Sequence, residues 1–93
     1  GVTEIGANAF YDSCLTSVNI PDSVTTIGNS AFTYCHSLTS VYCKATTPPS
    51  LGSNVFNNNA SGRTIYVPTA SVEAYKTAEY WSEYADTIVG YDF

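Results

Sequence analysis

The chain has 93 residues, of which three are Lys or Arg and eight are Asp or Glu, giving a formal net charge of −5. This length fits one domain. So few basic residues exclude the positive footprint of a nucleic-acid-binding protein and argue against binding to an anionic membrane surface. No apolar run approaches the roughly 20 residues that span a bilayer, so we expect no membrane insertion.

An apolar pattern recurs along the first half of the chain. In the first unit it occupies Val2, Ile5, Gly6, Ala9, Phe10, Leu15, Val18 and Ile20. In the second unit it occupies Val24, Ile27, Gly28, Ala31, Phe32, Leu38 and Val41. Self-similarity at a period of about 22 to 24 residues predicts a solenoid, in which no unit buries its apolar face alone. Because the chain begins inside a unit, we expect it to be the C-terminal part of a longer array.

Each unit carries the same local signals. Val18-Asn19-Ile20 alternates as a strand with one buried face does, and Pro21-Asp22-Ser23 ends it with turn residues. The β-branched run over 24–27 predicts a second short strand. Gly28 then permits a sharp bend. Ala31-Phe32 fits a helical turn that points its ring into the interior.

A third, looser copy follows at residues 51–56 and 64–68. It predicts one column of stacked rings through three units, formed by Phe10, Phe32 and Phe56. Before it, residues 44–50 form an insertion in which Pro48-Pro49 forces an extended path. We expect regular coiling to start failing there.

Three cysteines, Cys14, Cys35 and Cys43, cannot all pair within one chain. Buried free thiols suit the pattern best, because free Cys behaves as a small hydrophobe. A Cys14–Cys35 bridge between neighbouring coils and a metal site stay open as alternatives. The first unit is one residue short between Phe10 and Leu15, so we expect Cys14 to reach inward by a different loop path.

The run Ile-Pro-Asp-Ser-Val-Thr-Thr-Ile-Gly-Asn-Ser-Ala-Phe at 20–32, with Cys35 and Leu38-Thr-Ser-Val41, resembles the BspA-type leucine-rich repeat of bacterial surface proteins. The resemblance is close over 2–43 and loose over 51–68. It implies a curved solenoid with a parallel sheet along one side, secreted or held at the cell surface. It also implies an adhesin-like role toward host-derived ligands. Cys43 at the place of Ile20, the short first unit and the insertion at 44–50 depart from the pattern.

After Val67-Pro68 the repeat stops, and residues 69–93 read as a cap. Thr69 or Ser71 can cap a helix over about 70–78, and Ile88-Val89 can add a last strand before Gly90. The open end of a solenoid exposes core and sheet edge, so a covering segment is needed there. We expect Trp81 and Tyr84 to point inward. Five acids are expected to point outward, namely Glu73, Glu79, Glu83, Asp86 and Asp92.

The sequence gives little support for an enzyme. Cys35 and His36 could form a nucleophile and base, but catalysis needs them within hydrogen-bond reach and a third group to orient the base. Since Cys35 belongs to the inward pattern, His36 should point out. The cysteines lack zinc-ligand spacing and the acids form no calcium loop. We therefore expect no catalytic residues, no metal and no cofactor.

Binding is better placed on the outer face of the main sheet. Equivalent outward positions on parallel strands, roughly 4.8 Å apart, form rows. One predicted row is Asn19, Tyr42 and Tyr66, and the row beside it is Ser17, Ser40 and Thr64. Exposed Tyr beside small hydroxyl residues is typical of binding surfaces. The alternative is that Tyr simply suits a half-exposed strand.

The sequence thus predicts a mainly β leucine-rich-repeat solenoid with some helix, made of about three short parallel coils over 1–68 and a C-terminal helical cap over 69–93. The predicted function is a non-enzymatic surface or secreted module that binds a protein or glycan through that sheet face. The alternative is a structural terminal cap of a longer array, with the ligand site in upstream repeats. The bare first coil also predicts end-to-end self-association.

Overall fold

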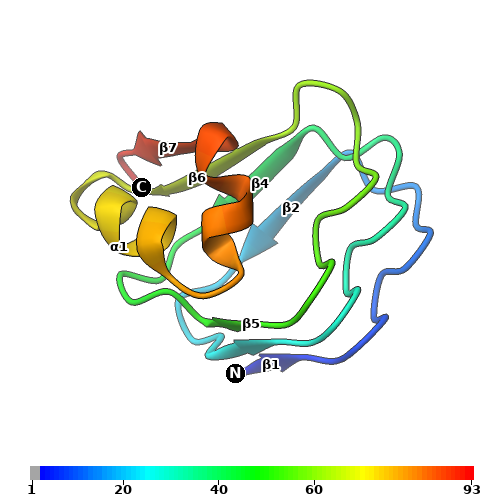
Figure 1. Cartoon of the computed structure of the whole chain (residues 1–93), viewed down its shortest axis with the longest axis horizontal. Coiled ribbons are helices and arrows are strands. Elements are labelled where there is room, and N and C mark those ends of the chain that lie inside the picture. The colour runs from blue at the N-terminus through cyan, green and yellow to red at the C-terminus, as the bar shows by residue number, and fades with distance from the viewer. Residues whose placement is uncertain (1–2) are drawn as a thin grey trace.

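Each coil of the chain contributes one strand to each of two parallel sheets (Figure 1). The computed structural model describes residues 3–93. The three-stranded sheet consists of β1 (Glu4–Ile5), β3 (Thr26–Ile27) and β5 (Ser50–Leu51). The four-stranded sheet consists of β2 (Ser17–Ile20), β4 (Ser40–Cys43), β6 (Thr64–Pro68) and β7 (Ile88–Tyr91).

The pairing register follows the sequence repeat. Val18 pairs with Val41, and Val41 pairs with Ile65, so equivalent positions of successive units lie side by side. Val41 and Ile65 are fully buried, whereas Val18 in the first coil is half-buried. The expected solenoid of parallel coils with short helices is therefore confirmed.

The predicted aromatic column runs through the interior. The rings of Phe10 and Phe32 are stacked 5.2 Å apart, and those of Phe32 and Phe56 are stacked 5.5 Å apart. Phe32 and Phe56 are buried, but Phe10 is 39% exposed because no described coil covers it. The column ends at Trp81, whose ring centroid lies 5.9 Å from that of Phe56.

The segment around Ala31-Phe32 is a series of tight turns and not the helical turn predicted above. Its amides donate alternately within the turn and to the next coil: the Ala31 N–H bonds to the Gly28 carbonyl, and the Phe32 N–H bonds to the Val55 carbonyl. Residues with positive φ recur at equivalent places of the three coils, namely Asn8, Asp12, Ser30, Tyr34, Asn54 and Asn58. This path places every second amide between coils.

Gly28 directly precedes the turn that begins at Asn29, but the requirement for glycine comes from close coil stacking and not from a left-handed backbone conformation. Its φ is not positive; among the described glycines only Gly62 has a positive φ. A Cβ at Gly28 would lie 2.4 Å from the backbone nitrogen of Ala7 in the preceding coil. The equivalent Gly52 approaches Asn29 in the same way, whereas Gly6 has open space around it.

Coiling does not fail at the insertion. Ser50 pairs with Thr26 and Leu51 with Ile27, so the third coil returns to register at once. The inserted residues instead supply acceptors to the following segment: the Ala45 carbonyl accepts from Tyr75 Oη at 2.6 Å, and the Pro49 carbonyl accepts from Trp81 Nε1 at 2.8 Å. The insertion therefore serves as the platform on which that segment packs.

Residues 69–93, which we call the cap, run from the 3₁₀-helix η1 (Thr69–Ser71) through α1 (Val72–Thr77) and the 3₁₀-helix η2 (Trp81–Thr87) into β7. Tyr75 and Trp81 are fully buried and Tyr84 is nearly so. The five cap acids are all exposed. β7 then pairs in parallel with β6 and lengthens the larger sheet by one strand.

Neither predicted capping side chain closes the helix amino terminus. Ser71 is the N-cap residue of α1, but its Oγ donates to the Thr46 carbonyl at 2.8 Å in the inserted loop. The Thr69 hydroxyl lies 3.3 Å from the Asp92 carboxylate. Both hydroxyl groups form tertiary contacts instead, one with the inserted loop and one with the chain end.

All three cysteines are free, and the expectation of a buried Cys14 was wrong. Cys35 and Cys43 are buried, whereas Cys14 is exposed. Ser13 takes the half-buried place equivalent to Cys35, and its Oγ accepts from the Leu15 N–H. The residue missing from the first unit has thus shifted the thiol outward.

Candidate binding face

The structure places the predicted outward residues in two rows across the four-stranded sheet. Asn19 pairs with Tyr42, and Tyr42 pairs with Tyr66. The sheet register sets the order of the three residues in this row. They share one face because inward and outward side chains alternate along each strand. In the neighbouring row Ser17 pairs with Ser40, and Ser40 pairs with Thr64. The structure therefore brings all six predicted residues onto one face.

Tyr42 and Tyr66 form a stacked pair. Their ring centroids lie 4.8 Å apart and their planes differ by 12°. Both side chains are half-buried, and their inward neighbours Val41 and Ile65 are fully buried. The two rings are held by the spacing of the strands, so they form a fixed part of the surface.

The cap adds aromatic residues that the sequence interpretation missed. Tyr91 packs edge-on against Tyr42 at 5.7 Å and against Tyr66 at 5.5 Å, and Phe93 packs on Tyr91 at 5.0 Å. Val89 pairs with Tyr66 and is also exposed. The period-2 spacing of residues 89, 91 and 93 was the sequence signal that could have predicted them on one face of a strand. We call the surface formed by these side chains and the two rows above the tyrosine face.

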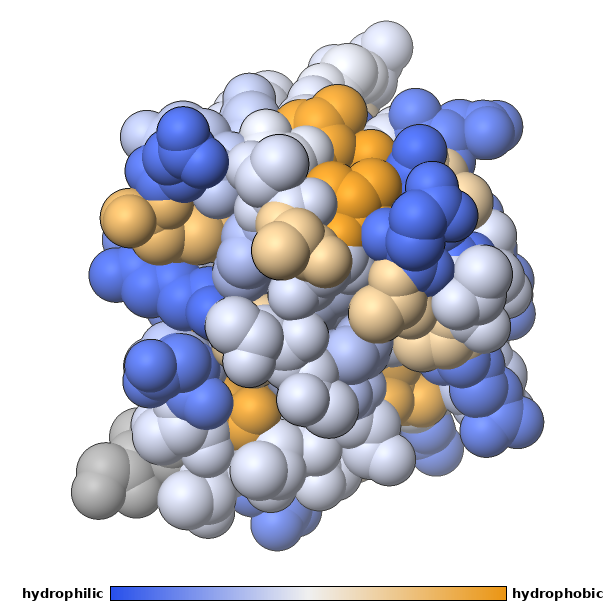
Figure 2. All heavy atoms as spheres, turned by 90° about the vertical axis from the view of Figure 1, so that its left-hand side faces the viewer, coloured by the Kyte–Doolittle hydropathy of each residue, from blue (hydrophilic) through white to orange (hydrophobic). Residues whose placement is uncertain are grey.

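The end of the molecule that carries β7 and α1 is largely polar. Viewed from that side, the largest area of strongly hydrophobic atoms lies in the upper half of the surface, and smaller ones lie in the lower half among polar side chains (Figure 2). Tyr91 is 45% exposed and Phe93 50% exposed. These two rings are the most exposed large hydrophobic side chains of the tyrosine face.

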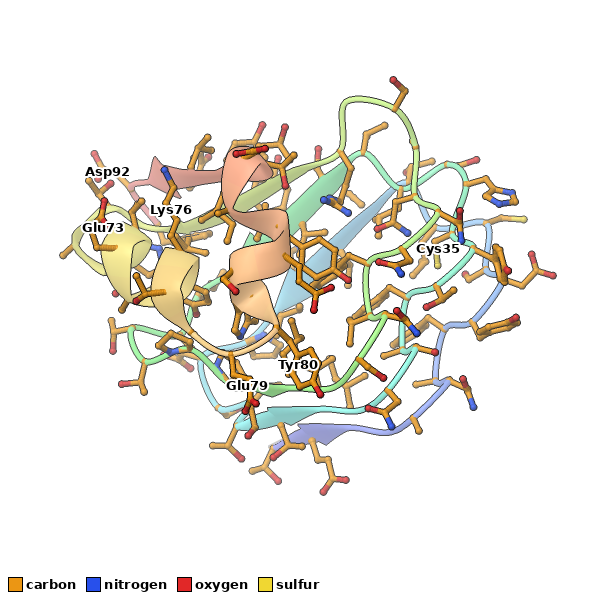
Figure 3. All side chains as sticks on the ribbon, in the orientation of Figure 1. Cys35, Glu73, Lys76, Glu79, Tyr80 and Asp92 are labelled. Carbon is orange, nitrogen blue, oxygen red and sulfur yellow. The ribbon has the colours of Figure 1, made fainter. Side chains whose placement is uncertain are left out.

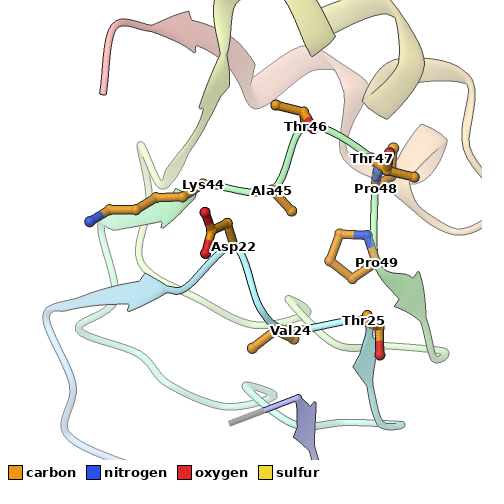
Figure 4. A pocket seen from close by; sticks show the side chains of 9 residues that line it. All are labelled: Asp22, Val24, Thr25, Lys44, Ala45, Thr46, Thr47, Pro48 and Pro49. Carbon is orange, nitrogen blue, oxygen red and sulfur yellow. The ribbon is translucent and has the colours of Figure 1, made fainter. Parts of the chain in front are cut away.

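A cleft of about 420 Å³ lies elsewhere, between the turn after β2 and the inserted loop. Val24, Ala45 and the two prolines give it apolar walls, and Asp22 lies at its rim (Figure 4). The Lys44 ammonium group points away from the cleft. This hollow arises because the three-residue turn of the first coil faces the longer insertion of the second. None of the predicted site residues lines it.

The geometry does not assemble a Cys–His pair. Cys35 is buried and its Sγ donates to the Phe10 carbonyl at 3.1 Å, whereas His36 is exposed and packs edge-on against Tyr34 at 5.8 Å. Cys35 lies at the opposite side of the molecule from Glu73 and Asp92 of the cap (Figure 3). Neither acid is therefore placed to orient His36.

Residues 3–93 contain neither a metal-binding cluster nor a membrane-spanning helix. No group of three or more His, Cys, Asp or Glu side chains is arranged to hold a metal ion there. Over the same residues, no helix combines the length and apolarity needed to cross a bilayer.

Comparison with protein families identifies a family of repeat proteins. The model described as BspA type leucine rich repeat region (6 copies) matches residues 3–86. The match covers the three coils and continues through α1 into η2. Comparison with curated proteins gives no significant match.

Proposed function

Because this chain belongs to the BspA-type leucine-rich repeat family, we propose that it is a non-enzymatic module that binds a protein ligand through its tyrosine face. Leucine-rich repeat families are typically non-enzymatic, and this family is generally associated with bacterial surface proteins. We accordingly propose that the module is secreted or displayed at the cell surface and acts as an adhesin toward a host-derived ligand.

The observation that carries this proposal is the contact between Tyr42, Tyr66 and Tyr91 on one sheet face. Tyr offers a large amphipathic contact area with only two side-chain torsions to order on binding. Here the rings already support one another, so little further side-chain entropy is lost when a partner docks. Small hydroxyl groups at Ser17 and Ser40 lie beside them and can adapt their hydrogen bonds.

Ring orientation favours a protein over a glycan. Sugar rings stack on exposed aromatic faces, but Tyr42 and Tyr66 turn their faces toward each other. Tyr91 meets both of them at an interplanar angle of 65°. Rings packed against one another beside hydroxyl groups suit the mixed apolar and polar contacts of a protein interface.

The test is binding to immobilised extracellular-matrix proteins, with an immobilised glycan panel beside them. Tyr91→Ala and Phe93→Ala, at exposed positions, should reduce binding to the responsive matrix protein at least tenfold, as central aromatic residues of interfaces do. Tyr42→Ala and Tyr66→Ala should do the same. Thr77→Ala, on the exposed surface of α1, serves as the matched control and should leave binding unchanged.

Two outcomes would contradict the proposal. Binding only to glycans would move the ligand class from protein to sugar. Unchanged binding of all four variants, measured in a longer protein that contains this chain, would favour the alternative function. In that alternative residues 1–68 are the last coils of the solenoid, residues 69–93 close the array, and recognition takes place on other repeats.

A further inference from the structure

Arg63 interrupts the repeat in the third coil. Since Ser17, Ser40 and Thr64 are register partners, the residues before them, Thr16, Thr39 and Arg63, occupy equivalent places. The first two coils thus carry a threonine where the third carries the only arginine of the sequence. This arginine in place of threonine lies next to the cap, where it contacts Thr87.

The guanidinium group of Arg63 is fixed by neutral partners. Nη1 donates to the Phe56 carbonyl at 2.7 Å and to Asn59 Oδ1 at 3.2 Å, and Nη2 donates to Thr87 Oγ1 at 3.0 Å. The group also lies over the Tyr84 ring, 5.1 Å from its centroid. These contacts hold its plane and direction.

The positive charge of Arg63 has no carboxylate partner among residues 3–93. Its Nε is buried and lacks an acceptor within the same residues. Burial lowers the pKa of Arg63, and the nearby Tyr84 opposes that shift. A guanidinium group keeps its charge under these conditions, so the site presents a fixed cation that the described chain leaves uncompensated.

A pocket of about 390 Å³ opens beside this cation. Its lining includes three consecutive asparagines, Asn57, Asn58 and Asn59, together with Thr87. The side-chain amides of Asn57 and Asn59 already form hydrogen bonds within the chain, both as donors and as acceptors. The amide of Asn58 makes no hydrogen bond to the described chain, and its residue is exposed. Nη2 keeps one hydrogen beyond the one given to Thr87.

We propose that this pocket binds the carboxylate-bearing ring of an acidic sugar, with Arg63 Nη2 donating to the carboxylate and the Asn58 amide bonding the ring hydroxyls. The carboxylate supplies the missing negative charge, and hydrogen bonds to charged groups are the stronger ones. Amides both donate and accept, as sugar hydroxyls do. The volume lies at the small end of the roughly 300–1,000 Å³ typical of ligand pockets, which suits one ring better than an extended acidic peptide. The site uses none of the side chains of the tyrosine face.

The experiment is an NMR titration of the intact chain that follows the Arg63 Nε–H signal. That signal is unambiguous because the sequence has one arginine. Sodium glucuronate should shift it saturably, together with the asparagine side-chain amides. At matched ionic strength, glucose, which lacks the carboxylate, should bind at least tenfold more weakly, and sodium acetate should give no saturable shift.

Asn58→Gly provides the matched variant, since Asn58 is exposed and has a positive φ that glycine adopts without strain. It should leave the Tm nearly unchanged and weaken glucuronate binding about three- to tenfold, the effect of one lost hydrogen bond. Arg63→Lys keeps the charge but loses the planar donor set, and should abolish the shift of the asparagine side-chain amides, which report binding in this variant; if it unfolds the chain, Asn58→Gly still decides. No saturable shift with glucuronate overturns the proposal. Equal responses to glucuronate and acetate, or to glucuronate and glucose, also overturn it.

Discussion

The ring of Tyr42 lies face to face with the ring of Tyr66, at a centroid distance of 4.8 Å. The distance equals the spacing of neighbouring strands in a sheet. Parallel pairing in exact register is therefore sufficient to build the stack, and no loop has to hold it. Substitutions that keep the ring and substitutions that remove it therefore separate the contribution of the stack to stability from the contribution of the hydroxyl group.

Tyr42→Phe keeps the stacked ring, and we expect it to change the free energy of unfolding by less than about 0.5 kcal/mol. Tyr42→Ala removes the stack and should cost about 1 kcal/mol, within the range measured for aromatic pairs. Urea unfolding of both variants measures the difference. Equal losses for Phe and Ala would show that the hydroxyl group, and not the ring, supports the face.

Phe32→Ala should destabilise the fold by about 3–5 kcal/mol, because a fully buried aromatic side chain leaves a cavity when truncated. Phe10→Ala, at the same place in the first coil, should cost only about 1 kcal/mol, since Phe10 stacks on one side and is partly exposed. The measurement is again urea unfolding. Similar costs at the two positions would mean that the Phe10 ring is covered in solution.

Gly28→Ala should destabilise the fold by about 1–3 kcal/mol or more, because the new Cβ would collide with the backbone of the preceding coil. Gly6→Ala is the matched control. Its Cβ meets open space, so its effect should lie between zero and a stabilisation of about 1 kcal/mol through reduced unfolded-state entropy. Thermal unfolding of the two variants tests the difference, and a tolerated Gly28→Ala would contradict the close coil contact.

Alkaline pH should weaken the fold through Tyr75. Burial, and secondarily Cys43, raise the pKa of the Tyr75 hydroxyl far above its usual value. The folded state then keeps a proton that the unfolded chain releases, so stability is complete below about pH 10 and is lost as the pH rises further. The slope approaches about 1.4 kcal/mol per pH unit for this one proton.

Tyr75→Phe is the variant that tests this dependence. It removes the titration and the hydrogen bond to the Ala45 carbonyl, so it should be less stable than the parent at pH 7. Its stability should also fall less steeply between pH 10 and 11.5. Urea unfolding across that range gives both slopes, and parallel curves would exclude Tyr75 as the group responsible.

We propose that the chain associates end to end through its first coil. β1 and β2 each have a strand partner on one side only within residues 3–93, and unpaired edges template further pairing. Gly6→Lys should suppress association without unfolding, because its side chain enters open space but blocks the approach of another coil. Sedimentation velocity over a range of concentrations measures this. A monomer at every concentration would contradict the proposal.

The repeat spacing was enough to predict the ring column and the order of the outer row. Both follow from aligning equivalent positions, as with Phe10 and Phe32 or with Asn19 and Tyr42. No long-range information is needed there, since each coil contacts its sequence neighbours. A one-residue deletion, by contrast, disrupted the alignment locally and misplaced Cys14.

The contribution of the cap could not be read in the same way. The sequence predicted that the last strand ends before Gly90, yet Gly90 lies within β7. It approaches Thr69 so closely that a Cβ on residue 90 would lie 3.1 Å from the Thr69 Cα. The predicted outward rows therefore did not include Tyr91, which the structure adds to the tyrosine face. Arg63 stood out as the only arginine of the sequence, but its partners could not be predicted, because residues 56 and 59 lie in the preceding loop and residue 87 lies at the end of η2.

The alternation of amide partners along the turns has a consequence for how the coils come apart. If the first coil lifts from the second, the amides of Asn8, Phe10 and Asp12 lose their acceptors, while those of Ala9 and Tyr11 keep theirs inside the turn. The hydrogen-exchange rates of these backbone amides would then alternate between fast and slow along residues 8–12. This alternating pattern distinguishes the lifting of a whole coil from local unfolding of its turns, in which both sets of amides would exchange at similar rates.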